Sequence, residues 1–410
     1  MDAIEGNHPR KQTTTNNALI VRYRVYSRRV RMMLHLGGVL QDRTHSATQS
    51  YIVGFLVIFM CLPQCVFLFN FTRHHVGNLL LIVKCFGQIC TFFAPVLMSA
   101  CFLKKRKKLI ELHETLKDLF ERELAQDPEV ALANLYAFDR PYWMGFCFTG
   151  LTILFYVCPS MISIIRQIVH QTEPRRYRLP FMAEFPWTVH VDGGFLFYLH
   201  YLYHLIVAWY IVITINSVDG LFGFYAFQIS SVLNAMTVKL INWRSRETFS
   251  EMLVTCIRMH GQLLQCSNML EDIWQLIIVR LLLVNSMLIC ALIFEASQII
   301  RFQFTDISST EVFGFVFYIS LKLLQTFMYA LYGNFITSAS EQFCEGIYFS
   351  EWPDSNLDRH VRANVIVTMM QKPITIRALK MTSVNVTMFS NIVNTAMSYF
   401  FLLQSVNEDT

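Results

Sequence analysis

Charged residues are scarce in this chain of 410 residues. Asp, Glu, Lys and Arg make up 15% of it and apolar residues 54%, against about 25% charged in an average soluble domain. Residues 1–49 contain no apolar segment of signal-peptide length, so we expect no cleavable signal. The net charge of +5 requires no nucleic-acid partner, because basic residues flank membrane spans on the cytosolic side. The composition therefore predicts a protein that lies in the lipid bilayer.

The sequence also lacks the usual signatures of catalysis and metal binding. No GxSxG, HExxH or glycine-rich phosphate loop occurs, so we expect neither an enzyme nor a cofactor. No CxxC pair is present, and none of the 11 cysteines falls in a predicted outer loop, so we expect no zinc site and no structural disulfide. His200 and His204 have the spacing of a helical metal pair, but no third ligand accompanies them.

Seven apolar stretches run through the chain, each close to the ~20 residues that a helix needs to cross a ~30 Å hydrocarbon core. With seven crossings, the two ends of the chain lie on opposite sides of the membrane. The sequence therefore predicts an all-α membrane protein with seven transmembrane helices, over 50–70, 79–103, 143–165, 195–217, 276–299, 311–332 and 384–404.

Lysine and arginine are distributed unevenly between the segments that join these stretches. Alternate segments, beginning with residues 1–49, contain 25 Lys and Arg, whereas the other set contains six. The basic block 104–108 directly follows the second stretch. Because cytosolic segments are enriched in basic residues, we expect a cytosolic N-terminus and an extracellular C-terminus. In this orientation the sequon that begins at Asn70 lies at the first outer loop, which makes Asn70 a candidate glycosylation site.

Several helices are expected to continue beyond the membrane on its cytosolic side. After the second stretch, leucines recur at helical spacing until Asp127-Pro128 breaks the pattern. Residues 195–242 hold almost no helix breaker, and a helix of that length would reach ~70 Å. Residues 247–275 have a similar period and lead into the fifth stretch. Amphipathic helices need partners for their apolar faces, so we predict a packed cytosolic helical anchor that is shared between subunits.

The last stretch carries a polar stripe. Its polar residues fall at i, i+4, i+7 and i+11, which is one face of a helix, and they are Thr387, Asn391, Asn394 and Ser398. A polar stripe in a membrane span must face protein or water. Hydrogen bonds between helices would explain it, and so would a pore lining. Because the stripe runs the length of the span and ends at Leu402, we favour a pore with Leu402 as an apolar gate.

Few charges lie inside the predicted spans. Arg280 is close to a predicted cytosolic edge, which its long side chain can reach. Lys322 lies in the middle of the sixth stretch, and Glu295 is the acidic residue best placed to meet it. We therefore predict an ion pair between Lys322 and Glu295.

Aromatic residues gather in the outer halves of the spans. Together they suit an apolar cavity for a small hydrophobic ligand. However, phenylalanine is also common throughout membrane helices, and tyrosine is common at membrane interfaces. The candidate ligand-binding residues are Phe86, Phe155, Tyr156, Tyr203, Phe317 and Tyr318.

The C-terminal third of the chain resembles the insect odorant receptor family. The matching positions are Tyr332-Gly333-Asn334, Ser338, Glu341, Tyr348, Trp352 and Met370-Gln371-Lys372-Pro373. Further matches lie in the last stretch, at Phe389 and at Ser398-Tyr399-Phe400. The ending from Tyr399 to Gln404 also resembles the related insect gustatory receptors, which remain an alternative.

The resemblance implies an odorant-gated, nonselective cation channel in the plasma membrane of sensory-neuron dendrites. In such channels four subunits surround one pore, and a tuning subunit assembles with a shared co-receptor. The short connection 238–275 resembles that of a tuning subunit. By the same resemblance the polar stripe of the last stretch approaches the ion path, Leu402 is the gate, and a small volatile ligand binds among the outer halves of the spans.

Two other classes of membrane protein fit the sequence less well. A G-protein-coupled receptor needs an extracellular N-terminus, and a transporter is expected to show internal repeats.

The expected organisation of the chain has five parts. They are a cytosolic N-terminal segment (1–49), six spans with the ligand cavity (50–332), a cytosolic anchor segment (333–383), a pore-lining helix (384–404) and an extracellular tail (405–410).

Overall fold

The computed structural model describes residues 8–39, 47–77, 79–171, 175–189, 193–243, 249–301, 309–350, 352, 358–379 and 381–408. In these ranges the chain is almost entirely helical. The helices are α1 (His8–Leu36), α2 (Ala47–His74), α3 (Leu79–Lys104), α4 (Arg106–Gln126), α5 (Pro128–Leu132), α6 (Leu135–Val169), α7 (Phe195–Asn242), α8 (Phe249–Arg301), α9 (Ser309–Tyr348), α10 (Arg359–Met370) and α11 (Val386–Glu408). Two short strands, β1 (Arg377–Ala378) and β2 (Thr382–Ser383), pair antiparallel just before α11.

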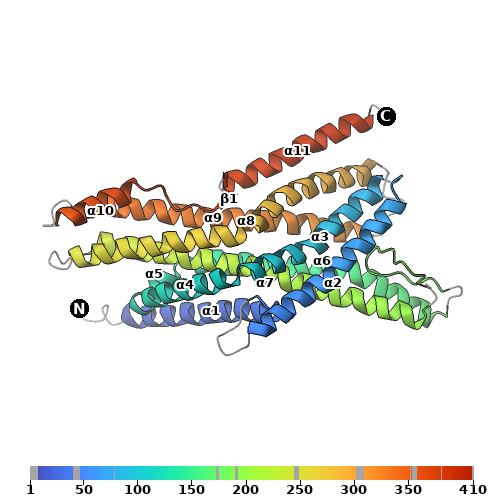
Figure 1. Cartoon of the computed structure of the whole chain (residues 1–410), viewed down its shortest axis with the longest axis horizontal. Coiled ribbons are helices and arrows are strands. Elements are labelled where there is room, and N and C mark those ends of the chain that lie inside the picture. The colour runs from blue at the N-terminus through green and yellow to red at the C-terminus, as the bar shows by residue number, and fades with distance from the viewer. Residues whose placement is uncertain are drawn as a thin grey trace, which may run out of the picture.

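The helices form one elongated bundle with two different ends (Figure 1). Helices α1, α4, α5 and α10 gather at one end, which we call the anchor end. Helices α2, α3 and α6 lie towards the other end, which we call the cavity end, while α7, α8 and α9 run through both. Helix α7 packs along α9, α6 and α1 and is the central element of the bundle.

Each of the seven predicted apolar stretches forms part of a helix, namely α2, α3, α6, α7, α8, α9 and α11. Among the described residues, five segments are long and apolar enough to cross a membrane: Ser50–His74, Lys84–Lys104, Pro128–Val169, Phe195–Asn242 and Phe249–Ile293. Helix α9 contains the sixth stretch with Lys322, and α11 contains the seventh with its polar stripe. The prediction of a helical membrane chain is confirmed.

The predicted extensions beyond the spans are present as continuous helices. Helix α7 has 48 residues, as the lack of breakers indicated, and α8 has 53, so the amphipathic 247–275 segment and the fifth stretch form one helix. Helix α4 ends at Gln126, where the side chain of Asp127 caps α5 by accepting hydrogen bonds from the backbone N–H groups of Glu129 and Val130. A proline at the first position of α5 completes the break between the two helices.

Helix α1 was not expected from the polar N-terminal sequence. It packs against α7 through Tyr26, Val30 and Leu34, which are buried. Arg22 of α1 forms an ion pair with Asp139 of α6, with 2.8 Å between Nη2 and Oδ2. The N-terminal segment is thus an integral part of the anchor end.

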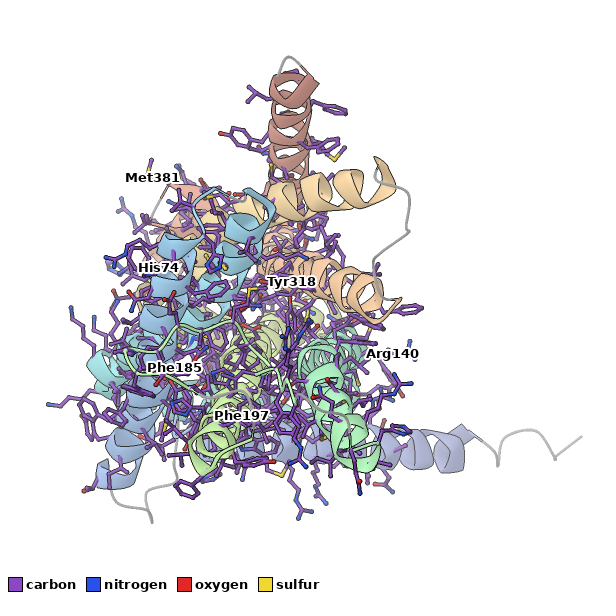
Figure 2. The ribbon with its side chains drawn as sticks, turned by 90° about the vertical axis from the view of Figure 1, so that its right-hand side faces the viewer. His74, Arg140, Phe185, Phe197, Tyr318 and Met381 are labelled. Carbon is purple, nitrogen blue, oxygen red and sulfur yellow. The ribbon has the colours of Figure 1, made fainter. Side chains whose placement is uncertain are left out.

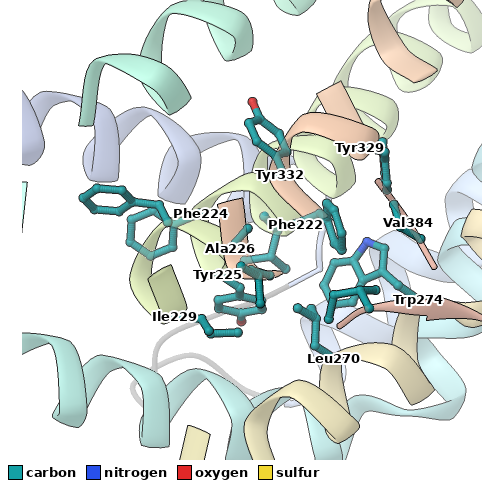
Figure 3. Close-up of a cluster of buried hydrophobic side chains, with 14 of the residues drawn as sticks. Phe222, Phe224, Tyr225, Ala226, Ile229, Leu270, Trp274, Tyr329, Tyr332 and Val384 are labelled. Carbon is teal, nitrogen blue, oxygen red and sulfur yellow. The ribbon is translucent and has the colours of Figure 1, made fainter. Parts of the chain in front are cut away.

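Charge pairs and aromatic packing join the helices of the anchor end. Lys105, which directly precedes α4, and Lys108 of α4 both contact the carboxylate of Asp272 on α8, each with 2.8 Å between Nζ and a carboxylate oxygen. Trp274 on α8 is fully buried beside Phe222 and Tyr225 of α7 (Figure 3). The same core extends to Tyr329 of α9 and to the segment that leads into α11.

The structure corrects the interpretation of Arg280. The side chain of Arg280 is 8% exposed and lies inside the bundle, so it does not reach out to a membrane edge. Lys322 is 3% exposed. The side chain of Glu295, its predicted partner, lies outside the described residues.

Candidate functional site

A cavity of about 790 Å³ lies among the helices at the cavity end. Its walls come from α3, α6, α7, α8 and α9, and the connection between α6 and α7 covers it. Both the volume and the mixture of aromatic walls with a few polar groups are typical of small-molecule sites. Figure 2 views this end of the bundle, where Phe185, Phe197 and Tyr318 come from the connection, from α7 and from α9.

Three of the six candidate ligand-binding residues line this cavity, namely Phe155, Tyr156 and Tyr318. The other three, Phe86, Tyr203 and Phe317, do not line it. The hydroxyl of Tyr203 donates a hydrogen bond to the carbonyl of Met60 at 2.8 Å, which ties α7 to α2. Phe317 stacks on Phe155 with 5.1 Å between ring centroids, so it supports the cavity wall from behind.

Tyr318 is the polar anchor of the cavity wall. Its ring is 7% exposed, and its hydroxyl donates to the carbonyl of Gly87 at 3.1 Å. The hydroxyl of Thr91 lies 2.9 Å from the same oxygen. These two contacts join α9 to α3 at the cavity.

The largest part of the lining that sequence reasoning missed is the connection between α6 and α7. Residues 177–189 contribute Tyr177, Phe181, Phe185 and Trp187, among others, to the cavity. Tyr177 and Phe181 are buried although they belong to a loop. A signal was present in the sequence, since Tyr177 and Leu179 alternate with Arg176 and Arg178, as in an extended segment with one buried face.

Backbone hydrogen bonds hold this connection over the cavity. The amide of Glu184 donates to the carbonyl of Phe67 on α2 at 3.1 Å. The amide of Arg176 donates to the side chain of Gln167 on α6 at 2.8 Å. The hydroxyl of Ser160, also on α6, donates to the carbonyl of Arg178. The connection is therefore a fixed cover of the cavity in this structure.

The two histidines of α7 belong to the same aromatic surroundings. The indole N–H of Trp187 donates to Nε2 of His200 at 3.0 Å, and Nδ1 of His200 lies 2.6 Å from the carbonyl of Leu196. His204 is fully buried between Phe181 and Phe185, with centroid distances of 5.6 and 6.2 Å. The pair thus holds the cover in place by aromatic contacts.

The polar stripe of α11 faces away from its own subunit. Helix α11 packs on α8 and α9 through Met388, Ile392 and Ala396, which are buried. Leu402 is 60% exposed. The residues of the stripe are also all exposed, namely Thr387, Asn391, Asn394 and Ser398. The helix leans away from the bundle towards its C-terminus (Figure 1). The stripe therefore lies on the outer surface of this chain.

The candidate glycosylation site lies in a helix. Asn70 is half-buried in the last turns of α2, which continues to His74, whereas the sequence placed the sequon at a loop. The hydroxyl of Thr72 in the sequon donates to the carbonyl of Leu68 at 2.8 Å.

Comparison with known proteins assigns the chain to a family. The family model described as "7tm Odorant receptor" matches residues 78–397, which is most of the chain. Odorant receptor 82a of Drosophila melanogaster is 22% identical over 351 residues and covers 83% of this chain and 88% of the relative. Odorant receptor 47a of the same species is 22% identical over 347 residues, covering 81% of this chain and 86% of the relative.

The solved structure of the insect olfactory receptor OR5 from Machilis hrabei has the same fold. The TM-score between the two structures is 0.73 at 14% sequence identity. The superposition covers 94% of this chain and 99% of the OR5 chain. The odorant receptor coreceptor of Anopheles gambiae is 24% identical over 107 residues, covering only 26% of this chain and 22% of the relative. The match to the family model, which extends over most of the chain, shows that this protein belongs to the seven-transmembrane odorant receptor family.

Proposed function

We propose that this chain is the ligand-binding, or tuning, subunit of an odorant-gated cation channel in the plasma membrane of sensory-neuron dendrites. The observation that carries the proposal is the covered aromatic cavity at the cavity end. A cavity of about 790 Å³ bounded by Phe155, Tyr156 and Tyr318 suits a small volatile molecule with an apolar body. The structure of OR5 from Machilis hrabei has also been solved in complex with eugenol, a molecule of that kind.

The pore of this channel is formed by α11 together with its counterparts in neighbouring subunits. Four exposed polar residues on one helix face are costly in lipid and favourable against water. In the proposed complex Thr387, Asn391, Asn394 and Ser398 line the ion path, and Leu402 forms the apolar gate. The partner is the odorant co-receptor, and the N-terminus lies in the cytosol as the distribution of basic residues indicates.

A continuous series of contacts joins the cavity to the pore helix. Tyr318 lines the cavity and lies on α9. Further along α9, Gly333 lies so close to the carbonyl of Val384 that a methyl group at Gly333 would overlap it. Val384 lies two residues before the start of α11, which packs on α8 and α9. An odorant that binds the open state more tightly therefore shifts α9 and, through Val384, the start of α11.

Whole-cell current during application of a volatile panel tests the proposal. The chain is expressed with and without the insect co-receptor, while G-protein signalling is blocked. A rapid cation current that requires both the volatile and the co-receptor is the expected result. A current evoked by sugars or bitter compounds without the co-receptor would contradict the odorant assignment, and loss of the response under the G-protein block would contradict the channel.

A further inference from the structure

Three ionisable side chains from three helices meet between the cavity and the anchor end. They are Asp219 of α7, Arg280 of α8 and Lys322 of α9, which act on one another electrostatically. Both cations are more than nine-tenths buried. Lys322 follows Tyr318 by one helical turn on α9, so the cluster lies directly next to the cavity wall.

The carboxylate of Asp219 is already satisfied by neutral donors. Its Oδ2 accepts a hydrogen bond from the side-chain amide of Gln325 at 2.7 Å, and its Oδ1 accepts one from the hydroxyl of Tyr329 at 2.8 Å. Asp219 therefore contributes its negative charge at a distance, without an ion pair or a hydrogen bond to either cation.

The two cations have no acceptor in the part of the chain that the structure describes. Arg280 Nε is buried without a hydrogen-bond partner. The contact recorded for Lys322 Nζ is with the face of the Tyr318 ring, 5.4 Å from its centroid. The charged groups of the described residues that act on Lys322 are Arg280 and Asp219. Two positive charges thus face one negative charge in an apolar surrounding.

An uncompensated positive charge inside a membrane bundle is unfavourable, because low-dielectric surroundings do not replace the hydration of the ion. Arginine keeps its proton under all ordinary conditions. The charge can therefore be balanced by a bound anion, by loss of the proton from Lys322 or by a carboxylate whose side chain is outside the described residues. Glu295 is such a carboxylate, but it lies 15 residues from Arg280 on the same helix, ~22 Å along α8, and cannot reach the guanidinium of Arg280. The free guanidinium nitrogen of Arg280 favours the anion, since a neutral Lys322 would leave this donor without an acceptor.

We propose that Arg280 and Lys322 form a binding site for a single monovalent anion beneath the cavity. The anion is either chloride from the surrounding solution or the carboxylate of an odorant that occupies the cavity next to Tyr318. The second source rests on the proposed function, whereas the first does not. In both cases the anion joins α8 to α9, the two helices on which α11 packs.

The first experiment measures the melting temperature of the purified full-length chain, with the co-receptor where the complex is needed, in sodium chloride and in sodium gluconate of equal ionic strength. We expect the chain to melt about 2–4 °C higher in chloride, because a ligand that binds only the folded state stabilises it. Lys322→Met removes the excess charge and abolishes the difference. Asp219→Asn adds to the excess charge and enlarges the difference. Lys107→Met, on the exposed face of α4, is the control and keeps the difference of the unaltered chain.

The second experiment compares a straight-chain carboxylic acid with its methyl ester in cells that express the chain and the co-receptor. If the odorant supplies the anion, Lys322→Met raises the half-maximal concentration of the acid about tenfold or more and leaves that of the ester unchanged. A chloride effect without this selectivity assigns the site to chloride. The proposal is overturned if melting is the same in chloride and gluconate and the acid response does not depend on Lys322. Because melting needs no odorant response, failure of the channel assignment would leave the chloride result intact.

Discussion

The anchor end and the cavity end of the bundle are built from the same long helices but are packed in different ways. Around Trp274, the anchor end buries large aromatic side chains completely and adds charge pairs between helices. The cavity end contains a cavity of about 790 Å³ that the connection between α6 and α7 partly covers. Helix α7 makes the contrast plain, since its residues 220–233 are all buried whereas Phe195 and Trp209 are mostly exposed.

This difference in packing indicates that the two ends of the bundle have different roles. Dense packing fixes the helix positions at the anchor end, where a change of volume is felt throughout the core. At the cavity end the lining residues touch open space on one side, so they can change without loss of the fold. Stability should therefore depend on the anchor end and ligand response on the cavity end.

Two tryptophans, one at each end, give the strongest test of this division. Trp274 is fully buried and contacts Phe102, Phe222 and Tyr225, so Trp274→Ala should lower the free energy of unfolding by about 3–5 kcal/mol. Trp187 lines the cavity and is 49% exposed, so Trp187→Ala should change the ligand response with a much smaller loss of stability. Melting of the two purified variants measures both losses of stability. Equal losses of stability would refute the division.

Gly333 tests the contact between α9 and the start of α11. A methyl group at this position would lie 2.0 Å from the carbonyl oxygen of Val384, so the backbone before α11 must move. Such overpacking costs about 1–3 kcal/mol, and we expect Gly333→Ala to suppress the evoked current while the protein still reaches the cell surface. Gly150→Ala in α6 is the control, because nothing lies within 4 Å of the added methyl group. An undiminished current from Gly333→Ala would exclude this route of coupling.

Most helices of both ends could be predicted from the sequence, because hydrophobic period, chain length and the Asp127-Pro128 break are local signals, whereas the polar sequence of α1 gave no such signal. The polar stripe of α11 was visible for the same reason. The cover of the cavity was not, because the position of residues 177–189 depends on partners such as Phe67 and Ser160 that come from separate helices.

The convergence of Asp219, Arg280 and Lys322 was missed for a related reason. Arg280 and Lys322 were each assigned a depth from their own span, and only the packing of α7, α8 and α9 brings them together with Asp219. Only three of the six aromatic candidates line the cavity, for a similar reason. The position of a residue in the outer half of a span does not tell which side of the helix faces the cavity.

The gate prediction concerns an exposed part of α11 that the proposed channel would bury. Leu402 is 60% exposed at the end of the polar stripe, so Leu402→Ser should raise the current measured without odorant several-fold by admitting water to the gate. Val386→Ser is the control, because Val386 is also an exposed apolar residue but lies at the opposite end of α11. A leak current that is unchanged in Leu402→Ser, or equally raised in both variants, would argue against Leu402 as the gate.

The smallest effect is expected at the cavity wall. Tyr318→Phe keeps the ring that faces the cavity but removes the hydroxyl that joins α9 to Gly87 and Thr91 of α3. A hydrogen bond of this kind contributes about 1 kcal/mol, so the half-maximal odorant concentration should change about fivefold. Tyr203→Phe removes a comparable hydrogen bond, to Met60, away from the cavity and should leave that concentration unchanged. If both variants shifted the response alike, the effect would come from general loosening of the helices, and Tyr318 would have no special part in ligand recognition.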